Sequence, residues 1–333
     1  MEAMINDLLK PSAFPEAPEK VTMVQTHISV VFIGDEFVYK IKKPVDFGFV
    51  NYSTLALREE YCRKEVELNN RFSKGVYLGV YPVAFDGNIH TIDGKGEVVD
   101  YAVKMKRLED KDLMKFRFAD KKISTEDISR IAKSIAQFHK SAPRTNEIDD
   151  FGKMKVMKFT TDENFEQTAE FIGDSITKEQ YDALKNWTGN FYKNNEELFN
   201  ERIKAGKIRD CHGDLHMEHI CLTDPIIIFD CIEFNERFRY IDIASDLSFL
   251  LMDLEYNGGD DFAAQLCNDY LKYAGEQDIS ELIKFFKVYR AYVRGKVTSF
   301  MLKDKDVEED KKNTARTTAQ RYFALAHSYI LKD

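Results

Sequence analysis

Residues 212–216 of the chain are His212-Gly213-Asp214-Leu215-His216, and residues 226–230 are Ile226-Ile227-Ile228-Phe229-Asp230. The first run places an aspartate in a loop, and the second is a short apolar strand that ends in another aspartate. Phosphoryl transfer needs a carboxylate to accept the proton of the attacking hydroxyl group, and it needs further ligands to hold magnesium on the phosphates. Asp214, His219 and Asp230 have this layout, so the stretch predicts phosphoryl-transfer chemistry.

Before this stretch the chain carries mainly strand patterns. Segments rich in β-branched and aromatic residues, separated by turn residues, predict strands at 21–25, 29–33, 36–42, 79–85 and 98–106. One helical pattern interrupts them at 54–71, where Ser53 or Thr54 can act as the N-cap.

Beyond residue 108 the pattern is mostly helical. Apolar residues at helical spacing predict helices at 124–139, 178–195, 243–255, 261–274, 279–302 and 310–331. Strands followed by helices indicate an α+β chain with two lobes of different character. We place the sheet-containing N-lobe at about residues 1–107 and the helical C-lobe at about residues 108–333.

Composition excludes several classes of protein. The 333 residues are 44% hydrophobic and 32% charged, which is ordinary for a soluble protein with a buried core. The formal net charge of −9 argues against a nucleic-acid binder, and no apolar run reaches the roughly 18 residues of a membrane span. The chain starts without a signal-peptide pattern, and its five cysteines lack the regular spacing of a disulfide framework. We therefore expect a cytoplasmic protein with no nucleic-acid or membrane partner.

The motif at 212–216 resembles the HGDLH catalytic loop of aminoglycoside and choline kinases, and Asp230 resembles the magnesium-binding aspartate of the DFG element in protein kinases. Residues 239–244 resemble the helix start that follows in that family. The chain is thus identified as a member of the aminoglycoside-phosphotransferase branch of the protein-kinase-like superfamily. Residues 230–253 are similar to a bacterial subgroup of uncharacterised proteins that often carry a fused P-loop domain. Because no P-loop motif is present here, we expect a stand-alone version.

This resemblance implies a bilobal protein-kinase-like fold, with ATP in the cleft between the lobes. It implies an ATP-dependent phosphotransferase that moves the γ-phosphate to a hydroxyl group of a small molecule. Asp214 would be the catalytic base, and Asp230 with His219 would hold Mg²⁺. The family usually has asparagine where this chain has His219, and an imidazole is softer than an amide oxygen, so Mn²⁺ could be favoured.

The resemblance extends to the N-terminal half. Lys40 ends the third strand, where the family has the lysine that contacts the α- and β-phosphates. Glu65 on the following helix matches the glutamate that pairs with this lysine, and Glu67 is the alternative. Lys42 and Lys43 lie close by, and Lys42 shares a strand face with Lys40, so the choice of lysine depends on the motif downstream.

Further residues are implied as nucleotide contacts or supports. The turn at 25–29 takes the place of a glycine-rich phosphate loop, and its Thr26 and Ser29 hydroxyls would reach phosphate. Residues 104–108, with Met105 and Arg107, would be the hinge whose backbone holds adenine. The remaining assignments are supports of the catalytic loop: His212 through packing and hydrogen bonds, and Asp242 through a helix cap and backbone N–H groups.

Three alternatives stay open. His212, His216 and His219 could bind zinc with Cys211 or Cys221. The chain could be a pseudokinase that only binds nucleotide, which the histidine at 219 supports. It could also modify a protein, although no A-P-E signature of protein kinases follows Asp230.

Overall fold

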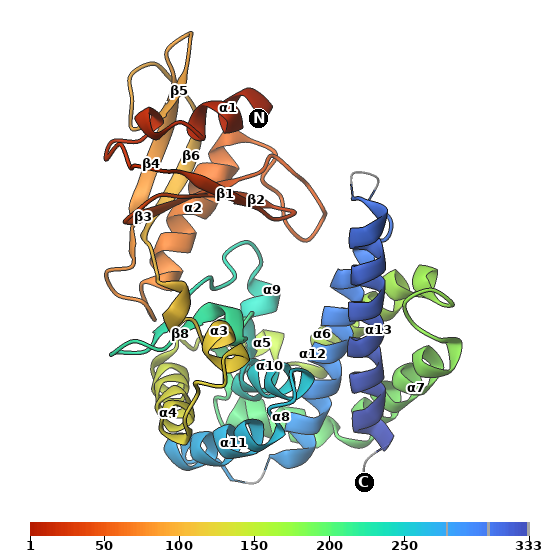
Figure 1. Cartoon of the computed structure of the whole chain (residues 1–333). Helices are drawn as coiled ribbons and strands as arrows, with labels where there is room; N and C mark the ends of the chain where they lie inside the picture. Colours follow the sequence, from red (N-terminus) through yellow and green to blue (C-terminus); the bar gives the residue numbers. More distant parts are fainter. Residues whose placement is uncertain (278, 305–306, 332–333) are drawn as a thin grey trace. The chain divides into compact units, whose positions relative to one another are not determined.

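A six-stranded antiparallel sheet forms the N-terminal part of the computed structural model, which describes residues 1–277, 279–304 and 307–331 (Figure 1). The strand order is β1-β2-β3-β6-β4-β5. The strands are β1 Thr22–Gln25, β2 Ser29–Ile33, β3 Phe37–Lys42, β4 Tyr77–Phe85, β5 His90–Ile92 and β6 Glu97–Lys106. All five predicted strands are present, and β5 is an additional short strand between two of them.

One helix, α2 (Leu55–Asn69), packs against strands β4 and β6. It begins at Thr54, whose Oγ1 accepts a hydrogen bond from the N–H of Leu57 (3.2 Å), which satisfies one of the free donors of the first turn. The buried positions of α2 recur at helical spacing and include the charged Glu65. The helix therefore presents a carboxylate, as well as apolar side chains, to the interior.

The opposite face of the sheet carries an apolar core. The short helix α1 (Glu2–Leu8) supplies Met4 and Leu8, and the 3-10 turn η1 (Pro11–Ala13) supplies Ala13; these pack with Phe32 and Ile41 of the strands. Since side chains alternate along β3, Tyr39 and Ile41 enter this core while Lys40 and Lys42 point to the other face.

The chain folds into two compact units. Unit 1 contains Met1–Lys122 and Glu218–Glu236, and unit 2 contains Ile123–Met217 and the chain from Arg237 onward. Unit 1 thus adds to the sheet and α2 the segment that carries Asp230. The lobe boundary near residue 107 stays a prediction.

The remaining elements of unit 1 are short. The segment 218–236 includes a small hairpin of β8 (Ile220–Cys221) and β9 (Ile227–Ile228), which pair antiparallel. Two short elements, η2 (Asp110–Asp112) and α3 (Met114–Ala119), follow β6 in the sequence, and an isolated bridge joins Leu113, between them, to Cys221 of β8. This bridge holds the hairpin within unit 1.

Unit 2 is largely helical. Its helices are α4 Thr125–Ser141, α5 Asn146–Phe151, α6 Met154–Thr168, α7 Lys178–Asn194, α8 Glu196–Lys204, α10 Ile243–Tyr256, α11 Asp260–Ala274, α12 Ser280–Phe300 and α13 Glu309–Leu331, with the 3-10 turn η3 at Ala169–Phe171. Helix α10 is buried from Ile243 to Leu254. It contacts both α11 and α12, and α4 lies along α11 (Figure 1). Helix α10 is therefore the central support of unit 2.

A two-stranded ribbon carries the predicted catalytic loop of unit 2. Strand β7 (Ile208–Asp210) pairs antiparallel with β10 (Tyr240–Asp242), and β10 leads directly into α10. The short elements η4 (Met217–His219) and α9 (Glu236–Arg239) lie at the two points where the chain passes between units. The sheet followed by a helical region confirms the α+β class expected from the sequence.

None of the described helices combines the length and apolar character needed to cross a membrane.

Candidate active site

Lys40 is the centre of the charged groups in unit 1. Its Nζ atom lies 2.9 Å from Oε1 of Glu65 and donates a hydrogen bond to Oδ1 of Asp230 (2.6 Å). The Lys40 side chain is 14% exposed and that of Glu65 is fully buried, whereas the Asp230 side chain is 39% exposed. The fold thus brings together three of the residues selected from the sequence. Glu67, the alternative to Glu65, is exposed.

The neighbouring lysines have different surroundings. Lys42 is 1% exposed and donates to Oε2 of Glu65 (2.6 Å), so it is enclosed by protein. Lys43 donates to the backbone oxygen of Thr26 (2.7 Å). Lys40 has both a glutamate partner on α2 and a contact to Asp230.

The charge of Lys40 is secured by its neighbours. Burial alone would lower the pKa of this lysine, but Asp230 and Glu65 outweigh burial, so the pKa is raised well above its ordinary value. The ammonium group therefore remains positive at neutral pH and can neutralise an anion such as a phosphate group.

Asp230 follows β9 and adopts a left-handed backbone conformation with φ of 61°. This region is uncommon for residues other than glycine, although aspartate tolerates it better than most. The backbone is held there because the N–H of Asp230 donates to the hydroxyl of Tyr77 (3.0 Å). Such strained positions concentrate at functional sites, and the carboxylate of this residue accepts a hydrogen bond from Lys40.

The donor atoms around Asp230 fit a divalent metal ion. Nε2 of His219 lies 3.5 Å from Oδ2 of Asp230, so one imidazole nitrogen and one carboxylate are close enough to share an ion. The Asp230 side chain remains partly exposed. Magnesium in nucleotide sites commonly takes one or two protein ligands and completes its shell with phosphates and water. A donor set of one oxygen and one nitrogen also suits manganese.

The two hydroxyls predicted to reach phosphate lie in different environments. Thr26 is exposed, and its Oγ1 accepts the N–H of Ser29 (3.0 Å) within the turn between β1 and β2. Ser29 is 1% exposed, and its Oγ has no hydrogen-bond partner among the residues that the structure describes. Thr26 is therefore accessible and Ser29 is not. Their contact with phosphate stays a prediction.

The predicted hinge lies at the end of β6. The backbone N–H of Arg107 donates to Glu36 O (2.8 Å), so that donor is already used within unit 1. Met105 packs in an apolar cluster that includes Tyr77, Ile227 and Phe229. The cluster offers an apolar surface near the hinge, while the adenine contacts of Met105 and Arg107 stay predictions.

Asp214 lies in the loop after β7, in unit 2. Its backbone N–H donates to Nδ1 of His212 (3.2 Å), and its Oδ2 lies 3.5 Å from Nε2 of His216. Burial alone would lower the pKa of His216, but the charge of Asp214 outweighs burial and raises it. His212 is completely buried, and its role as a support of the loop stays a prediction. Because Nδ1 of His212 is used by the loop, a zinc site through that nitrogen is disfavoured.

Asp246, in the first turn of α10, holds the backbone of this loop. Its carboxylate accepts the N–H groups of His212 (3.0 Å) and Gly213 (2.9 Å). Arg290 on α12 donates to the backbone oxygen of Gly213 (3.0 Å). The loop is therefore fixed by hydrogen bonds to two helices.

The sequence predicted that Asp242 would accept the backbone N–H groups of the loop, and this contact was wrong. Asp242 is the N-cap of α10, as expected, and accepts the N–H of Ala244 (2.8 Å). Both of its oxygens also accept from Arg202 on α8, at 2.7 and 2.8 Å. Its carboxylate is thus engaged by α8 and by its own helix, and Asp246, one turn further along α10, takes the loop N–H groups instead.

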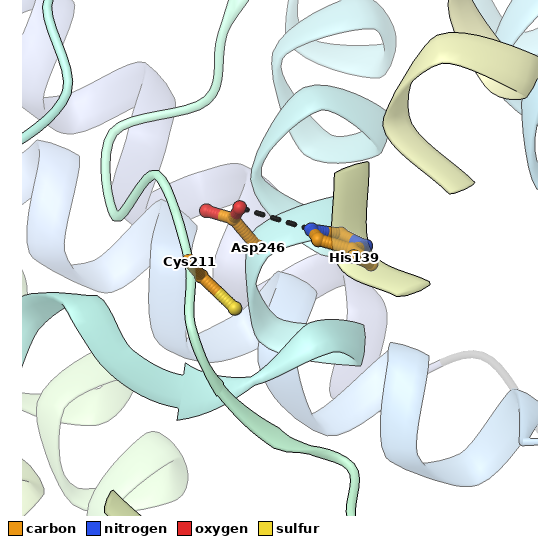
Figure 2. Close-up of side chains that lie close together, drawn as sticks. All are labelled: His139, Cys211 and Asp246. Atoms are coloured by element: carbon orange, nitrogen blue, oxygen red, sulfur yellow. Dashed lines mark hydrogen bonds and ion pairs between the residues drawn. The ribbon is translucent and has the colours of Figure 1, made fainter. Parts of the chain in front are cut away.

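Figure 2 shows the surroundings of Asp246, where His139 of α4 and Cys211 lie beside it. Nε2 of His139 lies 3.1 Å from Oδ2 of Asp246, and Nδ1 of His139 lies 2.8 Å from the Tyr270 hydroxyl. The ligand atoms of His139, Cys211 and Asp246 lie within 4.8 Å of one another. Since the imidazole and carboxylate already hydrogen-bond to protein groups, we interpret the cluster as a support of the loop.

Burial alone would raise the pKa of Asp246, but the hydrogen bond from His139 and the nearby positive charges outweigh it and lower the pKa to about 2. The carboxylate is therefore ionised at neutral pH, which strengthens its hydrogen bonds to the loop. Sequence reasoning missed Asp246 and His139. Their only signals were an acid in the first turn of a predicted helix and a histidine at the end of another.

Comparison with known proteins identifies the family to which the chain belongs. Residues 57–282, more than half of the chain, match the model of the APH phosphotransferase enzyme family. The chain belongs to this family.

Two mycobacterial proteins are similar in sequence to this chain. The chain is 31% identical over 275 residues to the uncharacterised proteins Rv2004c of Mycobacterium tuberculosis and Mb2027c of Mycobacterium bovis, covering 82% of this chain and 53% of each relative. It spans about half the length of these curated relatives.

Solved structures share the fold. Choline kinase LicA from Streptococcus pneumoniae superposes with a TM-score of 0.55 at 15% identity, covering 92% of this chain and 94% of that one. A choline/ethanolamine kinase family protein from Mesorhizobium loti gives 0.52 at 12% identity, covering 97% and 99%. The chain therefore has the kinase-like fold expected from the sequence.

Proposed function

We propose that the chain is an ATP-dependent phosphotransferase that transfers the γ-phosphate of ATP to a hydroxyl group of a small molecule. The observation that carries the proposal is the double contact of Lys40 with Glu65 and Asp230. A phosphate-binding lysine, the glutamate that orients it and a metal-binding aspartate are the parts that phosphoryl transfer requires in kinases.

Unit 1 supplies the groups for the nucleotide. Lys40 gives up its contact with Asp230 and neutralises the phosphates, while Glu65 keeps its ammonium group oriented. Asp230 and His219 hold Mg²⁺ or Mn²⁺, which when bound withdraws charge from the phosphate oxygens. Thr26 contacts the phosphates, and the hinge around Met105 and Arg107 contacts the base.

Unit 2 supplies the base. Asp214 accepts the proton of the acceptor hydroxyl, and its loop is held in one conformation by Asp246 and Arg290. A loop fixed before substrate binds needs no reorganisation during the reaction, and such preorganisation is a large part of enzymatic rate enhancement.

A small-molecule acceptor is supported by the similar structures. Their titles name choline kinase, a choline/ethanolamine kinase family protein and an amicoumacin kinase, and the last is similar at a TM-score of 0.51. We extend only the acceptor class, a small molecule with a hydroxyl group, to this chain. We also propose that it belongs to the subgroup whose members often carry a P-loop domain; its curated relatives are about twice as long as the matched region and so have room for a further domain.

Transfer of labelled γ-phosphate tests the proposal. The protein is incubated with γ-labelled ATP, Mg²⁺ and a low-molecular-weight bacterial extract, and labelled products are separated. We expect a labelled small molecule with the wild type and none with Asp214→Asn. Label on protein alone, or equal labelling by Asp214→Asn, would contradict the proposed function.

A further inference from the structure

A second lysine–glutamate pair lies beside the Lys40–Glu65 pair in unit 1. Lys42 donates to Oε2 of Glu65 (2.6 Å) and to Oε1 of Glu233. The Tyr52 hydroxyl donates to the same oxygen of Glu233 (2.6 Å). The exposed fractions are 1% for Lys42, 0% for Glu65, 0% for Tyr52 and 4% for Glu233. These four side chains form a buried polar network, and the proposed function uses only Glu65 of the four.

Simple stabilisation is a poor explanation for this network. Burying ions costs desolvation free energy, and well-packed apolar side chains of similar volume often stabilise a protein as well or better. A buried network is better explained when it fixes one particular arrangement of groups. The residues it connects then indicate its role.

Glu65 joins the two pairs. Its Oε1 faces Lys40 (2.9 Å) and its Oε2 faces Lys42 (2.6 Å). Glu233, at the other end of the network, lies three positions after Asp230. A continuous series of alternating charges thus runs from Asp230 through Lys40, Glu65 and Lys42 to Glu233.

The segment after Asp230 is fastened at other points within unit 1. The N–H of Cys231 donates to Oδ1 of Asn69 (2.9 Å), and Lys64 forms an ion pair with Glu236.

The carboxylates around Lys42 keep this lysine charged. Burial alone would lower its pKa, but Glu233 and Glu65 outweigh burial and raise that pKa. The network therefore connects β3, α2 and the Asp230 segment through a charged lysine.

We propose that Lys42 and Glu233 are positioning residues for nucleotide binding, which hold Glu65 in place when Lys40 turns from Asp230 to the phosphates. The inference rests on the proposed function. Lys42 balances the second oxygen of Glu65, and Glu233 prevents Lys42 from drawing Glu65 away from Lys40. Without this balance, Glu65 follows one lysine or the other.

The two single variants should disturb the Lys40–Glu65 pair in opposite ways. In Glu233→Gln the amide oxygen still accepts from Tyr52, but Lys42 is left with Glu65 as its only carboxylate and competes with Lys40 for it. In Lys42→Met, Glu65 and Glu233 both lose their nearest cation and act on Lys40, which holds that lysine away from phosphate. In the double variant Glu65 has Lys40 alone, so the first pair is restored.

Calorimetric titration with ATP and Mg²⁺ tests the inference, together with a melting curve for each variant. We expect each single variant to weaken ATP binding about tenfold, as is typical of coupled residues in one network. The double variant should bind ATP more tightly than either single variant. Glu59→Gln is the matched control, because it removes a carboxylate of α2 whose ion pair with Arg63 is partly exposed, with side chains 33% and 64% exposed, and it should bind ATP like the wild type.

The outcomes separate this inference from the proposed function. No ATP binding by the wild type overturns the proposed function itself. ATP binding by the wild type that is unchanged in a folded Glu233→Gln variant overturns the positioning role alone, even when its melting temperature falls. If Lys42→Met does not fold, Tyr52→Phe replaces it. This change removes only the hydroxyl that donates to Glu233 and accepts from Lys42, and it must also weaken ATP binding.

Discussion

The Nζ atom of Lys40 lies 2.6 Å from Oδ1 of Asp230, although 190 positions separate the two residues in the sequence. The contact joins the third strand of the sheet to the segment after β9. In the proposed function both partners of this contact change when nucleotide binds. A metal ion replaces the lysine at Asp230, and a phosphate group replaces the aspartate at Lys40.

Replacing Lys40 with methionine should weaken ATP binding about 10- to 100-fold, because a hydrogen bond to a charged group is worth about 1.5–3 kcal/mol and each 1.4 kcal/mol is about tenfold in affinity. Calorimetry with ATP and Mg²⁺ measures the loss. Lys95→Met, which removes an exposed lysine of the same unit, is the control and should bind like the wild type. Equal binding by both variants would exclude Lys40 as the phosphate-binding lysine.

Replacing His219 with asparagine should shift the metal preference toward Mg²⁺. An amide oxygen is a harder ligand than an imidazole nitrogen, and Mg²⁺ prefers oxygen whereas Mn²⁺ accepts nitrogen readily. The ratio of ATP affinities measured with Mg²⁺ and with Mn²⁺ should therefore rise in the variant. A ratio identical to that of the wild type would show that His219 does not contact the metal.

Replacing Asp246 with asparagine should destabilise unit 2 by about 2–3 kcal/mol at neutral pH, since the buried loop donors lose a charged acceptor. The pKa of Asp246 in the folded protein is about 2, below its ordinary 3.8. A lowered pKa means that this stabilisation is complete above pH 3.8 and is lost as the pH falls toward 2.

Urea unfolding at pH 6 and pH 3 checks that dependence. The difference in unfolding midpoint between the wild type and Asp246→Asn should shrink at pH 3. Asp182→Asn, which removes an exposed ion pair with Lys178, should shift the midpoint little at either pH. A difference that is the same at pH 3 and pH 6 would contradict the ionised state of Asp246.

Replacing Arg202 with methionine should destabilise unit 2 strongly, by about 3–5 kcal/mol, because it removes the cation that two buried carboxylates, those of Asp242 and Glu276, share. The melting temperature measures this effect. The double variant Arg202→Met/Asp242→Asn removes both charges and should recover part of the loss. A double variant less stable than the single one would mean that the ion pair has no such balancing role.

The sequence predicted the strands and most of the long helices, because turn residues and apolar spacing mark their ends. It missed α6 for a physical reason. The buried side of that helix includes Thr160, Thr161 and Asn164, so no apolar stripe reveals its inner face. The short helices α5 and α8 were also not predicted, and α8 has few buried positions.

Candidate site residues could be selected from the sequence where a motif contains them. They could not be selected where contacts between distant segments determine which side chain meets which. Alternation along β3 could not separate Lys40 from Lys42, because both point to the same face. Asp242 and Asp246 lie one turn apart on α10, and the sequence does not show which carboxylate meets the loop N–H groups. The role of Glu233 depends on Lys42, which lies 191 positions away, and no local pattern indicates that contact.

The central claim is that Asp230 binds the metal of a metal–ATP complex. Calorimetric titration of ATP into the wild type and into Asp230→Ala, with and without Mg²⁺ or Mn²⁺, tests it most directly. We predict metal-dependent binding by the wild type and its loss in a folded Asp230→Ala variant. Binding of ATP that needs no metal, or that is unchanged by the substitution, would contradict the account.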